Sequence, residues 1–239
     1  MTSRGRLARG AVVALAGLGL AACVPAPPEG ANGSGRPSPD LSTTSTTLAT
    51  GPELLADARQ FVYRVRSVAC LATGSSFATA QGIVTNRHVA SGSTSLQFST
   101  WAGTDFSTAL LALSTGPDLA LLTGLPKQHG PPIDTADLVV GTPVWAAGYP
   151  LGDQLSVIPG TVVGYVNGAQ YDEPGLVMEV TNPVQHGNSG GPLLDGRGQV
   201  VGIVVAIEDS NDDGLVIPAS TLSSFLDAPG SATVGQCLI

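Results

Sequence analysis

Residues 186–192 read His-Gly-Asn-Ser-Gly-Gly-Pro, and this stretch decides the fold. Glycine adopts backbone conformations that other residues avoid, so a serine among glycines can occupy a turn in which two amide N–H groups point at one spot. Such a turn can form an oxyanion hole beside a nucleophile, here Ser189. The same residues also match G-x-S-x-G, the nucleophile turn of the α/β-hydrolases. The neighbouring sequence must therefore separate two folds.

The residues after Ser189 argue against an α/β-hydrolase. That fold places its catalytic histidine after the serine, and no histidine follows Ser189 in this chain. Its serine turn also leads into a helix, whereas residues 192–194 run through the turn Asp-Gly-Arg-Gly at 195–198 into another apolar strand. The α/β-hydrolase interpretation fails on both counts.

Two segments upstream supply the other groups of a catalytic triad. The segment GIVTNRHVA at residues 82–90 places His88 directly after an apolar strand, where a neutral imidazole can serve as a general base. The segment STGPDLALL at residues 114–122 places Asp118 at the start of an apolar strand, where a partly buried carboxylate can fix the imidazole tautomer. Alone, each residue has an ordinary explanation as a core histidine, a turn-capping aspartate or a turn serine. Together, in the order His88, Asp118, Ser189, they predict a triad.

The composition of the chain favours an all-β fold. Its 239 residues include 31 Gly and 18 Pro but only 5% aromatic residues, so the apolar content is mainly Ala, Val, Leu and Ile interrupted by turns. This composition argues against a helical bundle. Short apolar runs predict two successive groups of about six strands, at 61–65, 76–80, 82–85, 95–99, 109–113 and 119–123, then at 144–147, 160–166, 176–180, 199–207 and 215–217. Helices are predicted at 52–60 and at 221–226, the second capped by Ser220.

The N-terminus has the features of an export signal. Three arginines within the first nine residues precede an apolar stretch at residues 11–22 that is short for a membrane span. This stretch leads into Leu-Ala-Ala-Cys, which resembles the bacterial lipobox, in which cleavage precedes the cysteine and the cysteine is acylated. We expect residues 1–22 to be a lipoprotein signal peptide and Cys23 to carry acyl groups such as palmitate. The alternative is an ordinary signal peptide with a chance cysteine.

Residues 23–51 are rich in Pro, Gly, Ser and Thr and have little to bury, which predicts a disordered tether. A flexible coil of that length spans on the order of 30 Å, and the folded domain is predicted at 52–239. Without its three N-terminal arginines the chain has seven basic residues against 18 acidic ones. Acyl chains rather than charge would therefore hold it at the extracytoplasmic face of the cell membrane. So acidic a chain also lacks the basic surface that nucleic-acid binding requires.

The motifs VTNRHVA, DLALL and GNSGGPLLD together resemble the three catalytic segments of the trypsin-like serine peptidases, particularly those of the bacterial HtrA-type branch. The resemblance covers about residues 60–226. It implies a chymotrypsin-like pair of six-stranded antiparallel β-barrels, at about 60–125 and 138–226, with a short C-terminal helix. The first two motifs would belong to the first barrel and the third to the second, with the site in the cleft between them.

The resemblance also assigns roles around Ser189. The amides of Gly187 and Ser189 would form the oxyanion hole. Asn188 stands where zymogen-activated relatives carry an aspartate, so activation by N-terminal cleavage is not expected. We also expect no PDZ domain after the peptidase domain, and therefore a monomer.

The resemblance places the wall of the substrate pocket at residues 183–186 and 204–207. Candidate substrate-binding residues there are His186, Val204, Val205 and Ala206. Neither stretch contains an acid, so the pocket cannot offset the desolvation of a Lys or Arg side chain. We expect a small or medium-sized apolar residue before the scissile bond. His186 could face either substrate or solvent, and His129 is expected in an exposed loop.

Two cysteines remain besides Cys23. The placement of Cys70 and Cys237 resembles that in the protease domain of the actinobacterial MarP-type periplasmic serine proteases, in which a disulfide ties the first barrel to the C-terminal tail. If Cys23 is acylated, these two are the single possible pair in an exported protein, where disulfides persist. The alternative is two free thiols.

These observations predict a lipid-anchored serine endopeptidase that hydrolyses protein or peptide substrates of the cell envelope through an acyl-enzyme. No cofactor and no metal are expected. The acidic run at residues 208–213 has oxygen ligands for Ca²⁺ but lacks the glycine and glutamate spacing of a known calcium loop, so it predicts a solvated turn. The alternative function is an envelope binding or sensing module that keeps the peptidase scaffold without turnover. Three intact triad residues favour the enzyme.

Overall fold

The computed structural model describes residues 48–127, 129–207, 213–231 and 236–237, without the side chains of residues 206 and 207. The predicted signal peptide, Cys23 and most of the tether lie outside the described residues, as does the acidic run up to residue 212. Within the described part of the chain, no helix is long and apolar enough to cross a membrane.

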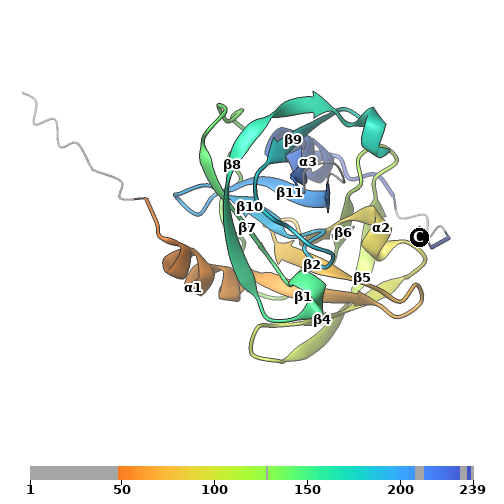
Figure 1. Cartoon of the computed structure of the whole chain (residues 1–239). Helices are drawn as coiled ribbons and strands as arrows, with labels where there is room; N and C mark the ends of the chain where they lie inside the picture. The colour runs from red at the N-terminus through yellow and green to blue at the C-terminus, as the bar shows by residue number, and fades with distance from the viewer. Residues whose placement is uncertain (1–47, 128, 208–212, 232–235, 238–239) are drawn as a thin grey trace, which may run out of the picture. The chain divides into compact units, whose positions relative to one another are not determined.

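The described residues form two closed β-barrels of six strands each (Figure 1). The strands of the first barrel, orange to yellow-green in Figure 1, are β1 (Val62–Ser67), β2 (Ala72–Ala78), β3 (Ile83–Thr85), β4 (Ser95–Ser99), β5 (Asp105–Leu113) and β6 (Ala120–Leu122). Those of the second, green to blue, are β7 (Pro143–Gly148), β8 (Ser156–Asn167), β9 (Leu176–Val180), β10 (Pro192–Leu194), β11 (Val200–Ile207) and β12 (Gly214–Pro218).

Hydrogen bonding connects the strands in the orders β1-β2-β3-β6-β5-β4 and β10-β11-β12-β9-β8-β7, and each barrel closes on itself. All pairs of neighbouring strands are antiparallel. The predicted pair of six-stranded antiparallel barrels is therefore confirmed.

Helical segments flank the barrels: α1 (Gly51–Phe61), α2 (Arg87–Ala90) and α3 (Ala219–Asp227), with 3-10 turns η1 (Pro150–Gly152) and η2 (Gly168–Tyr171). A capping box starts α1, where Thr50 N donates to Glu53 Oε2 at 2.7 Å. The sequence pattern misses α2, because four residues are too few to show a helical period. The predicted cap at Ser220 is wrong. Pro218 occupies the cap position, and Ser220 lies in the first turn of α3.

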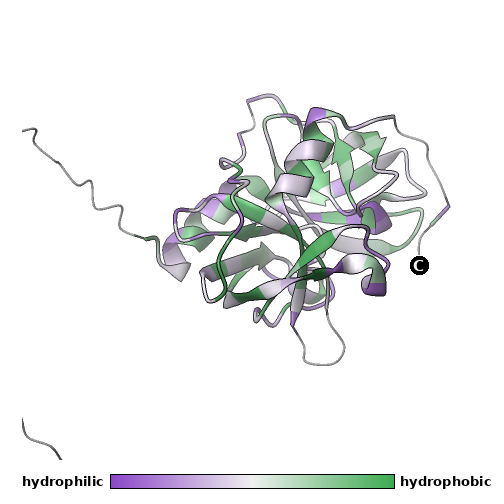
Figure 2. Ribbon diagram, turned by 90° about the horizontal axis from the view of Figure 1, so that it is seen from above, coloured by the Kyte–Doolittle hydropathy of each residue, from purple (hydrophilic) through white to green (hydrophobic). Residues whose placement is uncertain are grey.

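Hydrophobic residues predominate along the strands of both barrels, and hydrophilic residues are more frequent in turns and at helix ends (Figure 2). One cluster contains Phe77 and Phe98 of the first barrel together with Leu194 and Ile203 of the second, and each of these side chains is at most 1% exposed. Burying a side chain of this size contributes about 1.5–3 kcal/mol. Because the barrels share this core, the loops of one barrel are held in a fixed position against those of the other.

The helix α1 joins the two barrels from outside. It continues without a loop into β1 of the first barrel, yet it packs against β7 and β8 of the second. Its residues Leu54 and Ala58 are fully buried. Just before the helix, Ala49 N donates to Gly196 O at 2.7 Å, in the turn between β10 and β11. The chain is therefore attached to the second barrel before it enters the first.

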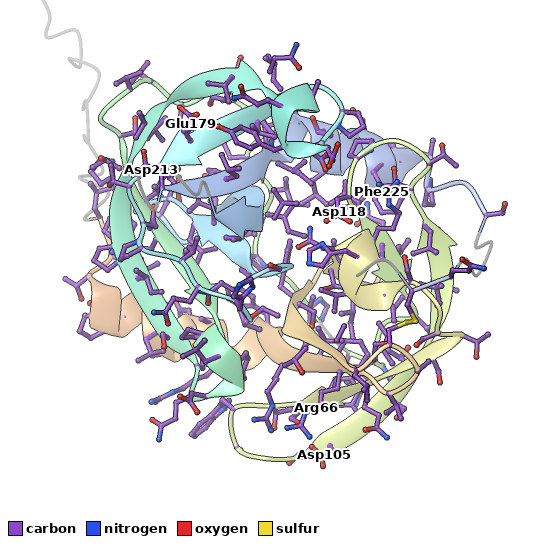
Figure 3. All side chains as sticks on the ribbon, turned by 45° about the vertical axis from the view of Figure 1, so that its right-hand side comes forward. Arg66, Asp105, Asp118, Glu179, Asp213 and Phe225 are labelled. Carbon is purple, nitrogen blue, oxygen red and sulfur yellow. A yellow bond between two sulfur atoms is a disulfide. The ribbon has the colours of Figure 1, made fainter. Side chains whose placement is uncertain are left out.

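A disulfide joins Cys70 to Cys237 across a sequence separation of 167 residues, as predicted (Figure 3, yellow bond). Both sulfur atoms pack against Gly92, where φ is +76°. A Cβ at this position would lie 2.5 Å from Cys70 Sγ and 2.9 Å from Cys237 Sγ, so only glycine fits. On the other side, Cys70 Sγ lies 2.8 Å from Ser91 O, directly after α2. The bridge therefore braces the C-terminal end of α2.

Candidate active site

The two barrel-1 residues of the predicted triad are in direct contact. His88 is the second residue of α2, and Asp118 lies just before β6, beside α2 in Figure 3. The Asp118 carboxylate contacts His88 Nδ1 through Oδ2 and accepts from His88 N at 2.8 Å through Oδ1. Because a carboxylate only accepts, Nδ1 carries the proton and Nε2 is left as the basic nitrogen. The imidazole is 38% exposed and the Asp118 side chain 11%.

Neighbouring side chains fix the backbone around Asp118. Asn86, which is fully buried, donates from Nδ2 to Asp118 O at 2.9 Å. Arg87 donates from Nη1 to Ser114 O at 2.9 Å and to Gly116 O at 3.0 Å. The turn that precedes Asp118 is thus tied to α2 at several points, and α2 carries His88. Sequence reasoning missed both Asn86 and Arg87.

Ser189 comes from the second barrel, but its main chain is bound to the first. Its carbonyl accepts from Ser75 N of β2 at 2.8 Å. Its hydroxyl donates to Val205 O of β11 at 3.4 Å, a long and therefore weak hydrogen bond. Among the described residues, no hydrogen bond joins Ser189 Oγ to His88. The structure thus brings His88 and Asp118 together, whereas the Ser189 hydroxyl is hydrogen-bonded to the carbonyl of Val205.

The turn around Ser189 contains two amides with no hydrogen-bond acceptor among the described residues. They are the N–H groups of Gly187 and Ser189. The other amides of the turn are all paired, namely Asn188 N with Gln185 O at 2.9 Å, Gly190 N with Val204 O at 2.8 Å and Gly191 N with Asn188 O at 2.9 Å. Backbone N–H groups in folded proteins are nearly always paired. Two neighbouring free donors therefore form a ready site for an anionic oxygen.

The peptide unit before Gly187 is held in one orientation. His186 O accepts from Leu151 N at 2.6 Å, and in a trans peptide the following N–H points the opposite way. Gly187 O in turn accepts from Ser75 Oγ at 2.7 Å, while Ser75 Oγ accepts from Tyr149 N at 2.8 Å. Gly187 has φ +96°, and a Cβ there would clash with Tyr149 O. Ser75 is a third residue that sequence reasoning missed.

Comparison with known proteins places the chain in a family. The family model described as "Trypsin-like peptidase domain" matches residues 72–203. The chain belongs to the trypsin-like peptidase family. Its relatives include the serine protease Rv3671c of Mycobacterium tuberculosis, 29% identical over 222 residues that cover 84% of this chain and 53% of the relative. They also include the Do-like serine protease HtrA of Bacillus subtilis, 33% identical over 159 residues that cover 61% of this chain and 35% of the relative.

Solved structures agree with this assignment. The active form of the Rv3671c protease from M. tuberculosis is 25% identical, with a TM-score of 0.64, and the match covers 78% of this chain and 89% of that one. The HtrA-type protease AlgW with a tripeptide has a TM-score of 0.68 at 22% identity, over 77% of this chain and 65% of that one, which supports the fold alone. The chain spans about a third to a half of the length of the curated relatives it matches.

The described side chains of the predicted pocket wall include no acid, and its two buried valines, Val184 and Val204, belong to the hydrophobic core of the second barrel. Val184 is 4% exposed and Val204 of β11 is 1% exposed. Val205 is partly buried, and its carbonyl accepts from Ser189 Oγ. Ala206 lies in β11 with its side chain outside the described part, and His186 is exposed.

One buried acid was not predicted. Glu173 of the peptidase domain is 3% exposed, and both its carboxylate oxygens accept from Asp118 N at 3.1 Å. Burial raises the pKa of Glu173 to about 7, because the charged form loses hydration, and the charge of Asp118 adds to the rise. The hydrogen bond from Asp118 N opposes this rise. The third histidine, His129, is exposed. In the described part of the chain, no group of three or more His, Cys, Asp or Glu residues could hold a metal ion.

Proposed function

We propose that this chain is a serine endopeptidase. Ser189 Oγ attacks the carbonyl carbon of the scissile peptide bond as His88 Nε2 takes its proton, and Asp118 keeps the ring oriented. The oxyanion of the tetrahedral intermediate accepts hydrogen bonds from Gly187 N–H and Ser189 N–H. Collapse of the intermediate gives an acyl-enzyme and passes the proton from His88 to the leaving amine. Water, deprotonated by His88, then hydrolyses the ester.

The observation that carries this proposal is the pair of unpaired N–H groups at Gly187 and Ser189. A turn that served only as structure would leave no reason for two adjacent donors without acceptors. Aimed at a developing oxyanion, such donors are each worth about 10²–10³-fold in rate. His88 and Asp118 supply the base that the reaction also needs.

The resting hydroxyl must move before it can react. Ser189 Oγ is bonded to Val205 O at 3.4 Å, and attack requires it to exchange this acceptor for His88 Nε2. Catalytic hydrogen bonds are often long or misaligned before substrate binds. A substrate strand that pairs with β11 would bring the scissile carbonyl to the same place.

Labelling of the purified protein with a fluorophosphonate tests the mechanism, since the reaction needs a working nucleophile and base. We expect covalent labelling at Ser189 and hydrolysis of unfolded protein that chelators do not affect. Ser189→Ala should remove the label and lower the hydrolysis rate by several orders of magnitude. Ser220→Ala, which changes an exposed serine of α3, is the matched control and should keep both. Undiminished hydrolysis by Ser189→Ala would refute the proposal.

A second candidate is a binding or sensing module without turnover. The hydrogen bond from Ser189 Oγ to Val205 O favours this candidate, because the hydroxyl is bonded to a strand carbonyl and not to the base, His88. Such a protein would bind extended peptides in the cleft yet remain unlabelled by the fluorophosphonate over hours. Labelling decides between the two candidates.

We also propose that the enzyme prefers a small or medium-sized apolar residue before the scissile bond. The described side chains at residues 183–186 and 204–205 include no acid, so a buried Lys or Arg would be left unpaired. The profile of peptide ends from a proteome digest measures this preference. Enrichment of Lys or Arg at the cleaved ends would contradict it.

The remaining proposal concerns location. Sequence features at residues 1–23 support acylation of Cys23 and attachment to the extracytoplasmic face of the cell membrane, where proteins of the envelope would be substrates. Mass spectrometry of the mature N-terminus should find an acylated Cys23, and Cys23→Ala should release or misprocess the protein. An unmodified Cys23 would rule out the anchor.

A further inference from the structure

Glu173 is an inward-facing acid in an otherwise exposed loop. It lies between η2 and β9 of the second barrel and is 3% exposed, while its neighbours Asp172 and Pro174 are exposed. Glu173 N donates to Gly168 O at 3.0 Å, and Gly168 N donates to Gly175 O at 2.7 Å. These two bonds close the loop and turn the Glu173 side chain inward. Glutamate is rarely buried in this way unless it has a partner.

The partner is the backbone of Asp118. Both oxygens of Glu173 lie 3.1 Å from Asp118 N. The other polar atoms of Asp118 are occupied from the first barrel, its carbonyl by Asn86 Nδ2 and its carboxylate by His88 N and Nδ1. Glu173 is thus a contact from the second barrel to the residue that orients His88.

We propose that Glu173 is a positioning residue for the triad. Its carboxylate anchors Asp118 through the backbone N–H and so couples the β8–β9 loop of the second barrel to the orientation of His88. This inference rests on the proposed peptidase function, because the orientation of His88 matters only if His88 acts as a base.

The charges around Glu173 determine how it acts. Asp118 faces it from the segment before β6, and Arg87 and His88 face it from α2. On its own loop, Asp172 is exposed to solvent. The ionised form of Glu173 places a second negative charge behind the Asp118–His88 pair, and this charge stabilises the imidazolium that forms when Ser189 attacks. The protonated form lacks that charge and accepts more weakly from Asp118 N.

Protonation of Glu173 therefore lowers activity, and this loss adds to the loss caused by protonation of the base, His88. Since burial raises the pKa of Glu173 to about 7, its proton comes off near neutral pH. On the acidic side, log kcat/KM of the wild type should rise with a slope greater than one over the pH range in which both groups lose their protons. A single titrating base gives a slope of one.

Two variants separate charge from hydrogen bonding. Glu173→Gln keeps an acceptor for Asp118 N but removes the charge, so we expect an acid-limb slope of one and a kcat about tenfold lower at pH 8. Glu173→Ala leaves Asp118 N without an acceptor, and its kcat should fall roughly 10- to 100-fold. The partial rescue by glutamine distinguishes positioning from mere packing. Asp172→Asn is the matched control, since it removes one exposed charge at the adjacent residue, and it should keep the wild-type profile.

The experiment measures kcat/KM from pH 5 to 9, the rate of fluorophosphonate labelling over the same range, and the unfolding temperature of each variant. A steep acid limb in the wild type and Asp172→Asn, reduced to slope one in Glu173→Gln, supports the proposal. Unfolding temperatures that fall while the slope stays unchanged would assign Glu173 a structural role only and overturn it. A wild type that is neither active nor labelled would instead overturn the peptidase function.

Discussion

Removal of the Cys70–Cys237 bridge tests how far the C-terminal tail supports the domain. The bridge closes a loop of 167 residues, which on the chain-entropy model corresponds to about 5 kcal/mol of stability. For a domain of this size each kcal/mol shifts the unfolding temperature by about 2–4 °C, so Cys70→Ser should lower it by roughly 10–20 °C. Cys237→Ser and the double variant should give the same shift, because all three remove a single interaction.

The same change should weaken catalysis. Ser91 lies 2.8 Å from Cys70 Sγ through its carbonyl and bonds to Arg87 O at 2.8 Å through its N–H. Without the bridge, the C-terminal end of α2 loses this support, and α2 carries His88. We expect kcat/KM and the fluorophosphonate labelling rate to fall roughly tenfold, with Ser189 intact by mass.

Differential scanning calorimetry with and without reductant, in parallel with peptide hydrolysis, measures both effects. Wild-type protein in reductant should match Cys70→Ser protein without it. Equal unfolding temperatures of wild type and Cys70→Ser would refute the entropic argument. A large thermal shift with unchanged labelling would refute the link from the bridge to His88.

Two other substitutions follow from the structure. Ser75→Ala removes the donor to Gly187 O and the acceptor of Tyr149 N, and we expect kcat/KM to fall about 10- to 100-fold. Ser76→Ala, which loses only a hydrogen bond to Tyr63 O within the first barrel, should affect stability more than activity, and equal activity losses in the two variants would contradict the role of Ser75. Glu173→Gln should also change the pH dependence of stability. Because burial raises the pKa of Glu173 from 4.5 to about 7, the folded state holds an extra proton between these values, and wild-type stability falls as pH rises through them. The variant lacks this loss, so its free energy of unfolding should come closer to that of the wild type, by about 2–3 kcal/mol, when the pH is raised from 4.5 to 8. Chemical denaturation at the two pH values measures this change. A difference in free energy between variant and wild type that does not change with pH would disprove the argument.

Local patterns in the sequence predict the parts of the structure whose cause is local. The glycine-rich turn at Ser189, the strand before His88 and the strand after Asp118 each have a signal within about ten residues. Two strands, β4 and β9, have the predicted bounds, because turn residues flank each apolar run at both ends.

Contacts between distant segments leave no such signal. Ser75 bonds to Gly187 across 112 residues, Glu173 to Asp118 across 55, and Asn86 to Asp118 across 32. Each of these residues lies in a segment whose local pattern is explained without it, so nothing marks it as part of the site. Glu173 in particular follows Asp172 and precedes Pro174 and Gly175, a composition typical of a solvated turn.

The packing of α1 has a consequence for the order in which the protein can fold as it is synthesised. The helix is made first, but the strands that cover Leu54 and Ala58, β7 and β8, begin more than 80 residues later. The first barrel is therefore made before the strands that cover α1 and before the second-barrel residues of the shared core, such as Leu194 and Ile203. It can complete its packing only when the second barrel has been made. The disulfide of Cys70 forms later still, after Cys237 has been made. Because the candidate site combines His88 and Asp118 of the first barrel with Ser189 of the second, it can assemble only after both barrels have been made.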